Sequence, residues 1–276
     1  MATADIAAPT PAPTDPQTST AYLVFDTESV PDGRLLSLTK YPGANLTAEE
    51  AVRKAQQEAS EHSRHGSTFL PVTFQYPVAV CVARVGSDLS LQAVTCLDAP
   101  QYRPRQIVSD FWRGVSLYPH ATLVSFNGRA FDLPLLELAA FRYGLTARAY
   151  FGQRRNSDRH LDLLNWFGNH GATRPAGGLD LYAKLLGLPG KMGMTGEQVY
   201  TYYREGRLSE INDYCMFDTL DTYFVFLRTR VLIGEITLEQ EHDLVSRARD
   251  WLTSKVKEKP ALRRYLDSWR DWHPWP

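Results

Sequence analysis

The chain has 276 residues, of which 43% are hydrophobic and 22% charged, proportions that are ordinary for a soluble globular protein. No apolar run approaches the roughly 18 residues needed to span a bilayer, so a membrane-spanning protein is excluded at this level. The formal net charge of −1 excludes a broadly basic surface, and any binding of nucleic acid therefore requires a local basic groove or brief contact with the polymer.

The N-terminal residues 1–20 are rich in Pro, Ala and Thr and contain no Lys or Arg. This composition predicts a disordered tail without a secretory or mitochondrial signal. The three cysteines, Cys81, Cys96 and Cys215, are far apart and lie in apolar runs, which predicts neither a disulfide framework nor a zinc site. A reducing, cytoplasmic location is therefore expected.

The first predicted strand, at about residues 21–27, begins with an apolar run. Residues 32–75 are polar, and we interpret them as an insertion that covers one face of the domain. Within it, a helix is expected after Thr47, whose side chain would form a capping box with Glu50. The apolar runs 77–85 and 89–97 flank Gly-Ser-Asp, which predicts a β-hairpin.

The rest of the chain alternates between one further predicted strand, at 121–127, and helices. Helices are expected at 104–118, 133–144, 160–188 in two pieces, 209–230 and 237–272. The order is a three-strand meander followed by a strand that alternates with helices. It predicts a mixed α/β sheet in one domain.

Two acids at the end of the first predicted strand, Asp26 and Glu28, are one residue apart. Residues i and i+2 of a strand point to the same face, so the two carboxylates would stand side by side. Like charges at that separation repel unless one is protonated or a cation lies between them. The alternative is that the strand has already ended and both acids are solvated.

Further acids follow at two later positions. Asp132 opens a predicted helix, where a negative charge is favourable at the N-terminus for purely structural reasons. Tyr214 and Asp218 lie four residues apart on one face of a largely apolar helix. Burying an ionised Asp218 on that helix is costly unless it is paired or binds a metal. The alternative is that Asp218 lies on a helix edge that faces water, together with Asp213 and Asp221 as ordinary exposed acids.

Three patterns occur in a fixed order: D-x-E at 26–28, N-x-x-x-F-D at 127–132 and Y-x-x-x-D at 214–218. Together they resemble the three exonuclease motifs of the DEDD superfamily of 3′–5′ exonucleases, in its tyrosine-containing branch. The resemblance is strongest to predicted bacterial exonucleases related to the proofreading domain of family B DNA polymerases. It covers roughly residues 21–235 and leaves 236–276 as a C-terminal helical extension that we expect to pack on the same domain.

This resemblance implies a ribonuclease-H-like mixed sheet flanked by helices and a site for two Mg²⁺ or Mn²⁺ ions. The implied metal ligands are Asp26, Glu28, Asp132 and Asp218, with Asp26 between the ions, and Tyr214 orients the attacking water. The implied activity is release of nucleoside monophosphates from 3′ ends of single-stranded DNA or RNA, with DNA favoured. The remaining residues leave no room for a polymerase palm, so a stand-alone nuclease without membrane association is expected.

Other candidates carry two interpretations each. Phe131 stacks on the terminal base or belongs to the core, and Lys191 in a glycine-rich loop binds a phosphate or is solvated. Asp162 either points inward as a fifth acid near the site or supports the fold or the metal ligands, and its position between the second and third motifs favours the supporting role. The remaining candidates are Asn127 in the second motif, a basic cluster of Arg154, Arg155, Arg159 and His160, and a tryptophan-rich segment, 269–276.

Three rival functions remain open at this stage. The first is a ribonuclease or structure-specific endonuclease on the same fold. The second is a catalytically silent nucleic-acid-binding module, which the presence of all four acids and the tyrosine disfavours. The third is an unrelated α/β protein with chance acids, which predicts no specific binding of divalent metal.

Overall fold

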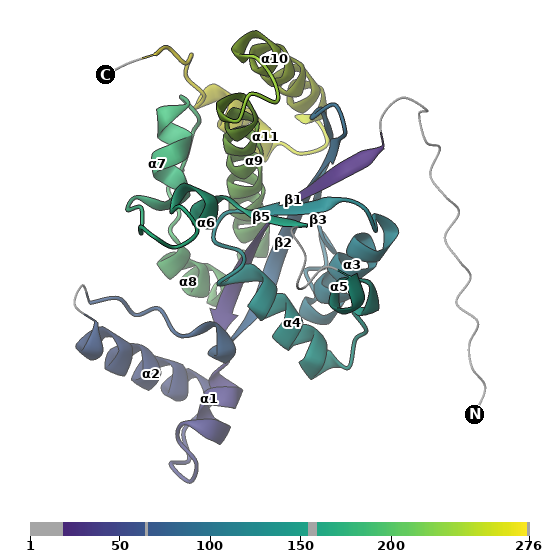
Figure 1. The fold of residues 1–276 in the computed structure, drawn as a ribbon. Helices are drawn as coiled ribbons and strands as arrows, with labels where there is room; N and C mark the ends of the chain where they lie inside the picture. Colours follow the sequence, from purple (N-terminus) through teal and green to yellow (C-terminus); the bar gives the residue numbers. More distant parts are fainter. Residues whose placement is uncertain (1–18, 64–65, 154–158, 275–276) are drawn as a thin grey trace.

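The computed structural model describes residues 19–63, 66–153 and 159–274 (Figure 1). The predicted disordered tail, residues 1–20, lies outside the described residues except for its last two. Of these, Thr20 already begins the first strand, so this strand starts slightly before the expected boundary.

The core of the molecule is a five-stranded sheet with the order β3-β2-β1-β4-β5. β2 is antiparallel to its neighbours β1 and β3, whereas β4 is parallel to both β1 and β5. This mixed sheet confirms the predicted α/β class and the ribonuclease-H-like arrangement. The strands are β1 Thr20–Pro31, β2 Gln75–Gly86, β3 Leu91–Cys96, β4 Thr122–Ser125 and β5 His160–Asp162.

The fifth strand corrects one expectation, because residues from 160 onward were predicted to be helical. His160–Asp162 instead pairs in parallel with Leu123–Ser125 at the edge of the sheet. A strand of three residues is too short to show the alternation that identifies strands in a sequence. Its conformation is fixed by hydrogen bonds to β4, which are tertiary contacts.

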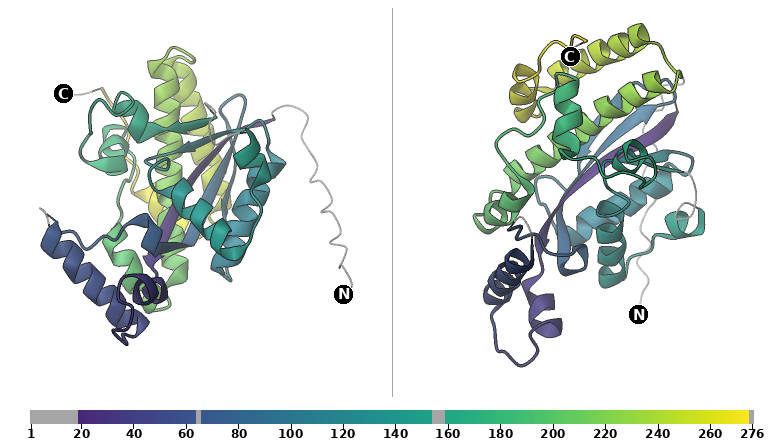
Figure 2. Two further views of the ribbon diagram at one scale, coloured as in Figure 1. Left: turned by 60° about the horizontal axis from the view of Figure 1, so that its bottom comes forward. Right: turned by 60° about the vertical axis from the view of Figure 1, so that its left-hand side comes forward.

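Helices cover both faces of the sheet (Figure 2). Along β1, Leu23 and Phe25 point into one apolar cluster together with residues of α3 (Pro104–Leu117) and α4 (Asp132–Tyr143). Val24 points the other way, into the cluster formed with α9 (Leu208–Leu232). The alternation expected of a strand therefore assigns each side chain of β1 to one of two helical layers.

Several predicted helix boundaries are confirmed by their caps. α4 ends at Gly144, which has φ +63° in the left-handed region that favours glycine. α2 (Ala48–His62) has the expected capping box, in which the side chains of Thr47 and Glu50 bond reciprocally. The remaining helices are α1 Gly33–Thr39, α5 Arg148–Gln153, α6 Leu163–Phe167, α7 Gly178–Leu185, α8 Val199–Arg204, α10 Leu238–Lys255 and α11 Ala261–Asp267, with 3₁₀ turns at Val72–Phe74 and Gly196–Gln198.

The insertion does not cover a face of the sheet as expected. Figures 1 and 2 show α1 and α2 beyond the end of β1. They have a small apolar cluster of their own, which includes Leu36, Val52 and Leu70. Asp32 ties this unit to α4, since it caps α1 and accepts a hydrogen bond from Arg142.

The C-terminal helices contact α9 through buried polar groups. Arg228 of α9 donates to both carboxylate oxygens of Glu241 in α10, at 2.9 and 2.7 Å. The Tyr265 hydroxyl of α11 donates to Asp221 of α9 at 2.7 Å. Asp221 is fully buried, so its interpretation as an exposed companion of Asp218 is wrong. Among the described helices, none is long and apolar enough to cross a membrane.

Candidate active site

The central strand β1 brings two of the predicted acids together. Asp26 and Glu28 share the face of β1 on which Val24 packs toward α9. Glu28 is paired with Ala79 of β2, so the strand has not ended at these residues. The alternative that both acids are simply solvated beyond the strand is therefore wrong, and Glu28 is only 8% exposed.

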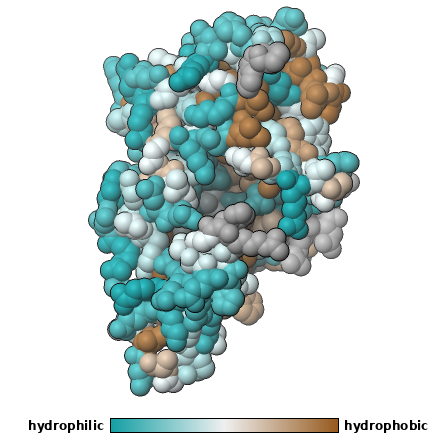
Figure 3. Space-filling model, turned by 90° about the vertical axis from the view of Figure 1, so that its left-hand side faces the viewer, coloured by the Kyte–Doolittle hydropathy of each residue, from teal (hydrophilic) through white to brown (hydrophobic). Residues whose placement is uncertain are grey.

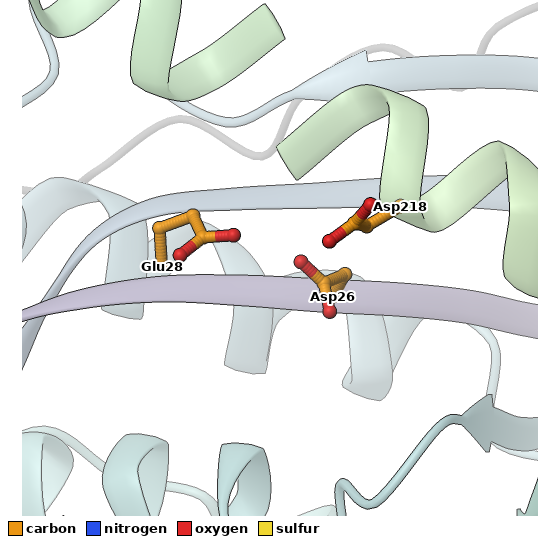
Figure 4. Close-up of side chains that lie close together, drawn as sticks. All are labelled: Asp26, Glu28 and Asp218. Atoms are coloured by element: carbon orange, nitrogen blue, oxygen red, sulfur yellow. The ribbon is translucent and has the colours of Figure 1, made fainter. Parts of the chain in front are cut away.

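The helix α9 supplies the third acid, Asp218, above the same face. Carboxylate oxygens of Asp26, Glu28 and Asp218 all lie within 4.8 Å of one another. Figure 4 shows the two strand residues pointing toward the helix that carries Asp218. α9 is held against β1 partly by Cys215, whose thiol donates to the Asp26 carbonyl at 3.3 Å.

The fourth predicted acid, Asp132, reaches this site from the other layer of helices. β4 pairs with β1 only as far as Val24, and α4 begins with Asp132 beside the part of β1 that follows. The Thr27 hydroxyl, on the opposite face of β1 from Asp26, donates to the Asp132 carboxylate at 2.5 Å. The charge of Asp132 raises the pKa of Asp26, although Asp132 is not one of the acids gathered within 4.8 Å.

The electrostatics of the four acids are unfavourable without a cation. Burial first, and then the neighbouring carboxylates, raise the pKa of Asp26 and the pKa of Glu28 well above their ordinary values. Burial also raises the pKa of Asp132 and the pKa of Asp218 to about 7. Among the described residues, Asp26 Oδ2 has no hydrogen-bond partner although it is buried.

These observations fit a site for divalent cations. Hard cations such as Mg²⁺ and Mn²⁺ prefer carboxylate oxygen, and a bound cation reverses the effect of like charges on a carboxyl pKa. The cluster offers several such oxygens in a small volume, and the unpartnered oxygen of Asp26 is available as a ligand.

Tyr214 lies one helical turn before Asp218 on α9 and is 6% exposed. Burial and the charges of Asp218, Glu28 and Asp26 raise its pKa well above the ordinary value, and a hydrogen-bonding interaction with Asp218 adds to the effect. The hydroxyl therefore stays protonated at neutral pH and can donate a hydrogen bond within the acid cluster.

The loop before Asp132 is organised by Asp162. The carboxylate of Asp162 accepts hydrogen bonds from the backbone N–H groups of Asn127 and Arg129, both at 2.9 Å, and caps α6 through Asn165. Asp162 thus supports the segment that leads to Asp132, and it is not one of the acids gathered within 4.8 Å. Asn127 is exposed in this loop and has φ +67°.

Gly128 is required in the same loop by close packing. A Cβ atom at this position would lie 2.3 Å from Ser125 Oγ and 3.1 Å from Asp132 Oδ2. The absence of a side chain therefore lets the loop approach the end of β4 and the first residue of α4. This explains in physical terms why a glycine occurs between Asn127 and Phe131.

Phe131 is partly exposed and does not belong to the core. Its ring packs against Phe69 from the insertion, with centroids 5.5 Å apart and planes tilted by 47°. Phe69 is 49% exposed. The pair offers an aromatic surface next to Asp132, and Phe69 is a residue that the sequence pattern did not single out, because it lies in an irregular segment of the insertion.

Lys191 is exposed in the loop that follows α7, and its positive charge reaches the acids. It lowers the pKa of Glu28 and the pKa of Asp218, opposing the larger effects of burial. Its backbone N–H donates to Asp180 of α7 at 2.7 Å, which fixes the start of the loop. The structure therefore brings Lys191 toward the cluster.

The predicted basic cluster is only partly described, since Arg154 and Arg155 lie outside the described residues. His160 does not belong to it. The ring is buried in β5 with Nε2 at 2.8 Å from Ser125 Oγ, and burial lowers its pKa to about 4. His160 is therefore uncharged at neutral pH, and of the described members only Arg159 retains a charge.

The fold and the site together define a class of protein: a ribonuclease-H-like α/β domain whose central strand carries clustered acids suited to divalent cations. A family model described as a predicted 3′–5′ exonuclease related to the exonuclease domain of PolB matches residues 67–269. The chain belongs to this family. The match begins after Asp26 and Glu28, so these two acids are placed at the site by the structure alone.

A solved structure, that of the family B DNA polymerase from the hyperthermophilic archaeon Pyrobaculum calidifontis, resembles this chain with a TM-score of 0.47 and 16% sequence identity. The similarity covers 76% of this chain and 24% of the polymerase chain. This chain therefore spans about a quarter of the length of that polymerase. Comparison with curated proteins gave no match.

Proposed function

We propose that this chain is a metal-dependent 3′–5′ exonuclease that releases nucleoside monophosphates from single-stranded ends, with DNA favoured over RNA. The observation that carries the proposal is the partly buried cluster of Asp26, Glu28 and Asp218, with Asp132 beside it, in a member of a predicted exonuclease family. Clustered carboxylates that raise one another's pKa values are typical of functional sites.

The four acids would hold two Mg²⁺ or Mn²⁺ ions, with Asp26 shared between them. When bound, such ions supply activation of a water molecule and stabilisation of the departing 3′ oxygen. Thr27 holds the carboxylate of Asp132 in place, and the packing of α9 on β1 holds Asp218 opposite Asp26.

Tyr214 has a separate role in the proposal. Its hydroxyl keeps its proton at neutral pH and lies beside Asp218, so it can orient the attacking water by donating a hydrogen bond or accepting one. Lys191 would neutralise the phosphate next to the cleaved bond. Asn127 and the aromatic pair of Phe131 and Phe69 would contact the terminal nucleotide, since bases stack on exposed aromatic rings without regard to sequence.

The decisive experiment follows matched 5′-labelled single-stranded DNA and RNA oligonucleotides over time with Mg²⁺ or Mn²⁺. The expected result is stepwise shortening from the 3′ end with mononucleotide products, faster on DNA. A 3′ phosphate should slow the reaction strongly, whereas a 5′ phosphate should not. Internal fragments would instead indicate an endonuclease, and faster cleavage of RNA a ribonuclease.

A complete lack of cleavage with intact metal binding would leave the silent binding module as the function. Metal binding is measured separately by calorimetry on the same protein. The absence of specific binding of divalent metal would indicate that the acids are unrelated to catalysis and would overturn the proposal.

A further inference from the structure

A second site in the molecule shares only Lys191 with the proposed chemistry. A cavity of about 570 Å³ lies between the loop that follows α7 and the segment that follows α11. We call it the basic cavity, because Lys184, Lys191 and Arg270 line it together with a single acid, Asp267. Its walls also include the half-buried ring of Trp269.

The walls of the basic cavity are fixed to one another. The Arg270 backbone N–H donates to the Gly187 carbonyl at 2.9 Å, which joins the C-terminal segment to the loop. Gly187 has φ +72°, and a Cβ atom there would lie 2.6 Å from the Arg270 carbonyl oxygen. Lys184 donates to the Pro189 carbonyl and so closes the loop back onto α7.

Trp269 anchors the other wall. Its ring packs edge-on against Phe224 of α9, with centroids 4.6 Å apart, and the guanidinium of Arg249 lies 4.9 Å from its centroid. The main chain on both sides of Arg270 is therefore held in place by contacts that do not involve the Arg270 side chain. The Arg270 side chain is exposed, and it extends from a main chain that these contacts hold in place.

The residues that line the basic cavity carry more positive than negative charges. Within the part of the chain that the structure describes, neither Lys191 nor Arg270 has a side-chain ion pair. Two nearby arginines do have ion pairs: Arg228 with Glu241 at 2.7 Å, and Arg249 with Asp271 at 3.8 Å. Three cations facing one acid attract an anion, and the guanidinium group of arginine matches phosphate oxygens well.

Lys191 relates the basic cavity to the acid cluster, because it lines the cavity and its charge acts on Glu28 and Asp218. α7, which precedes this loop, lies on the side of the molecule drawn in Figure 3, a mostly hydrophilic face with a hollow near its centre. A bound polyanion with one end at the acid cluster would pass Lys191 before it reached Arg270.

Building on the proposed function, we propose that the basic cavity binds phosphates of the substrate strand on the 5′ side of the cleaved bond. In a 3′–5′ exonuclease the terminal nucleotide occupies the acid cluster, so every other phosphate of the strand lies on its 5′ side. The C-terminal segment that carries Arg270 is then part of the substrate channel. Contacts to phosphate hold the strand without reading its sequence.

The test compares Arg270→Gln with Arg263→Gln, which removes the same charge from an exposed position of α11 outside the cavity. KM and kcat are measured on single-stranded DNA from 2 to 10 nucleotides long, at several salt concentrations. For Arg270→Gln, KM on the longer strands should rise about tenfold, the scale of one charge-assisted hydrogen bond, with kcat nearly unchanged. The slope of log KM against log salt should fall by about 0.7, as expected for one lost phosphate contact to a single strand.

The rise in KM caused by Arg270→Gln should become larger from dinucleotides to longer strands. Arg263→Gln should show no such rise. An equal rise in KM at every length would show that Arg270 acts only on the terminal nucleotide and would overturn the proposal. Equal behaviour of both variants would overturn it as well. Lack of cleavage by the wild-type protein would contradict the proposed function instead, and binding of fluorescent single strands by Arg270→Gln would then test the cavity independently.

Free nucleoside monophosphate has the same chemistry as a backbone phosphate and is the competing occupant. Product inhibition by deoxynucleoside monophosphate separates the two sources. If the basic cavity binds the strand, Arg270→Gln should leave the inhibition constant unchanged while KM on long strands rises. A tenfold weaker inhibition with unchanged KM would assign the cavity to the product and contradict the proposal.

Discussion

Two groups of carboxylates in this molecule, one of them a single residue, lie in opposite environments. Glu241 is 2% exposed and is paired with Arg228 through two hydrogen bonds at 2.9 and 2.7 Å. Carboxylate oxygens of Asp26, Glu28 and Asp218 lie within 4.8 Å of one another. Among the described residues, the exposed Lys191 lowers the pKa of Glu28 and the pKa of Asp218. The first group joins two helices, whereas the second accumulates repulsion that a bound cation would relieve.

The comparison distinguishes a carboxylate that stabilises the fold through an ion pair from carboxylates that have no such partner and can bind a cation. A buried ion pair offsets its own desolvation only when partners and hydrogen bonds are well placed, as they are for Glu241. A group of buried acids without such partners lowers the stability of the folded state. Its presence on the central strand is therefore explained by function better than by folding.

The largest expected effect is the loss of activity on removing a member of the acid cluster. Asp26→Ala or Asp132→Ala should lower the cleavage rate at least about 1000-fold, since a catalytic metal site supplies several kcal/mol of transition-state stabilisation. Stability without metal should rise or stay equal, because repulsion between carboxylates is removed. Rates with Mg²⁺ and thermal unfolding in a chelator measure the two effects.

Asp243→Asn, an exposed acid of α10, is the matched control and should change neither quantity. Full activity in a purified Asp26→Ala or Asp132→Ala variant would remove that residue from the proposed site. A large loss of stability in the chelator would show that the acid is structural, like Glu241.

The next effect separates the tyrosine from the metal ligands. Tyr214→Phe should reduce the single-turnover rate by roughly 10- to 1000-fold, the scale of one lost transition-state hydrogen bond or proton-transfer group. Metal affinity should stay nearly unchanged, because the carboxylates remain. Asp218→Asn should weaken both metal binding and rate, because it removes a charge next to the cations.

Tyr223 provides the control on the same helix. Its buried hydroxyl donates to the Leu89 carbonyl at 2.9 Å, away from the acids, so Tyr223→Phe should cost stability and leave the rate unchanged. If Tyr214→Phe cleaves at the wild-type rate, Tyr214 is a packing residue and its proposed role is wrong.

A smaller effect is expected from breaking the ion pair between Glu241 and Arg228, which stabilises the fold. Glu241→Gln removes the partner of Arg228, whose side chain is 27% exposed and can regain part of its solvation. The free energy of unfolding should fall by about 1–3 kcal/mol, with metal affinity unchanged. Denaturant unfolding and calorimetry measure these quantities. A change in metal affinity would show that the two groups of carboxylates are coupled.

The smallest effect on activity concerns Asp221. Its carboxylate is hydrogen-bonded by neutral groups, the Tyr265 hydroxyl at 2.7 Å and the backbone at Gly190. Burial raises its pKa to about 8, against about 3.9 in the unfolded chain. Between these values the unfolded chain has lost the proton that the folded protein keeps, so stability falls as pH rises from 4 to 8.

Asp221→Asn removes this titration and should flatten the dependence of unfolding free energy on pH, by up to about 4 kcal/mol between pH 5 and pH 8. Denaturant unfolding of both proteins at these two pH values in a chelator checks it. Equal slopes for the variant and the wild type would show that Asp221 is ionised in the folded protein.

Sequence alone determined the features that depend on local chemistry. The capping box at Thr47, the helix end at Gly144 and the hairpin were predicted because each rests on residues close together in the chain. The candidate acids were also visible, because D-x-E, N-x-x-x-F-D and Y-x-x-x-D are short patterns whose order is preserved. Their convergence was implied by the family resemblance rather than derived.

Features that depend on contacts between residues distant in sequence were decided only by the tertiary structure. The three-residue strand β5 exists through its pairing with β4, and Asp221 is buried because α11 covers it. The contact of Thr27 with Asp132 joins residues 105 positions apart. The basic cavity joins Lys191 to Arg270 through a backbone hydrogen bond at Gly187. No local pattern encodes such pairs, because their free energy comes from packing that exists only when the whole chain has folded.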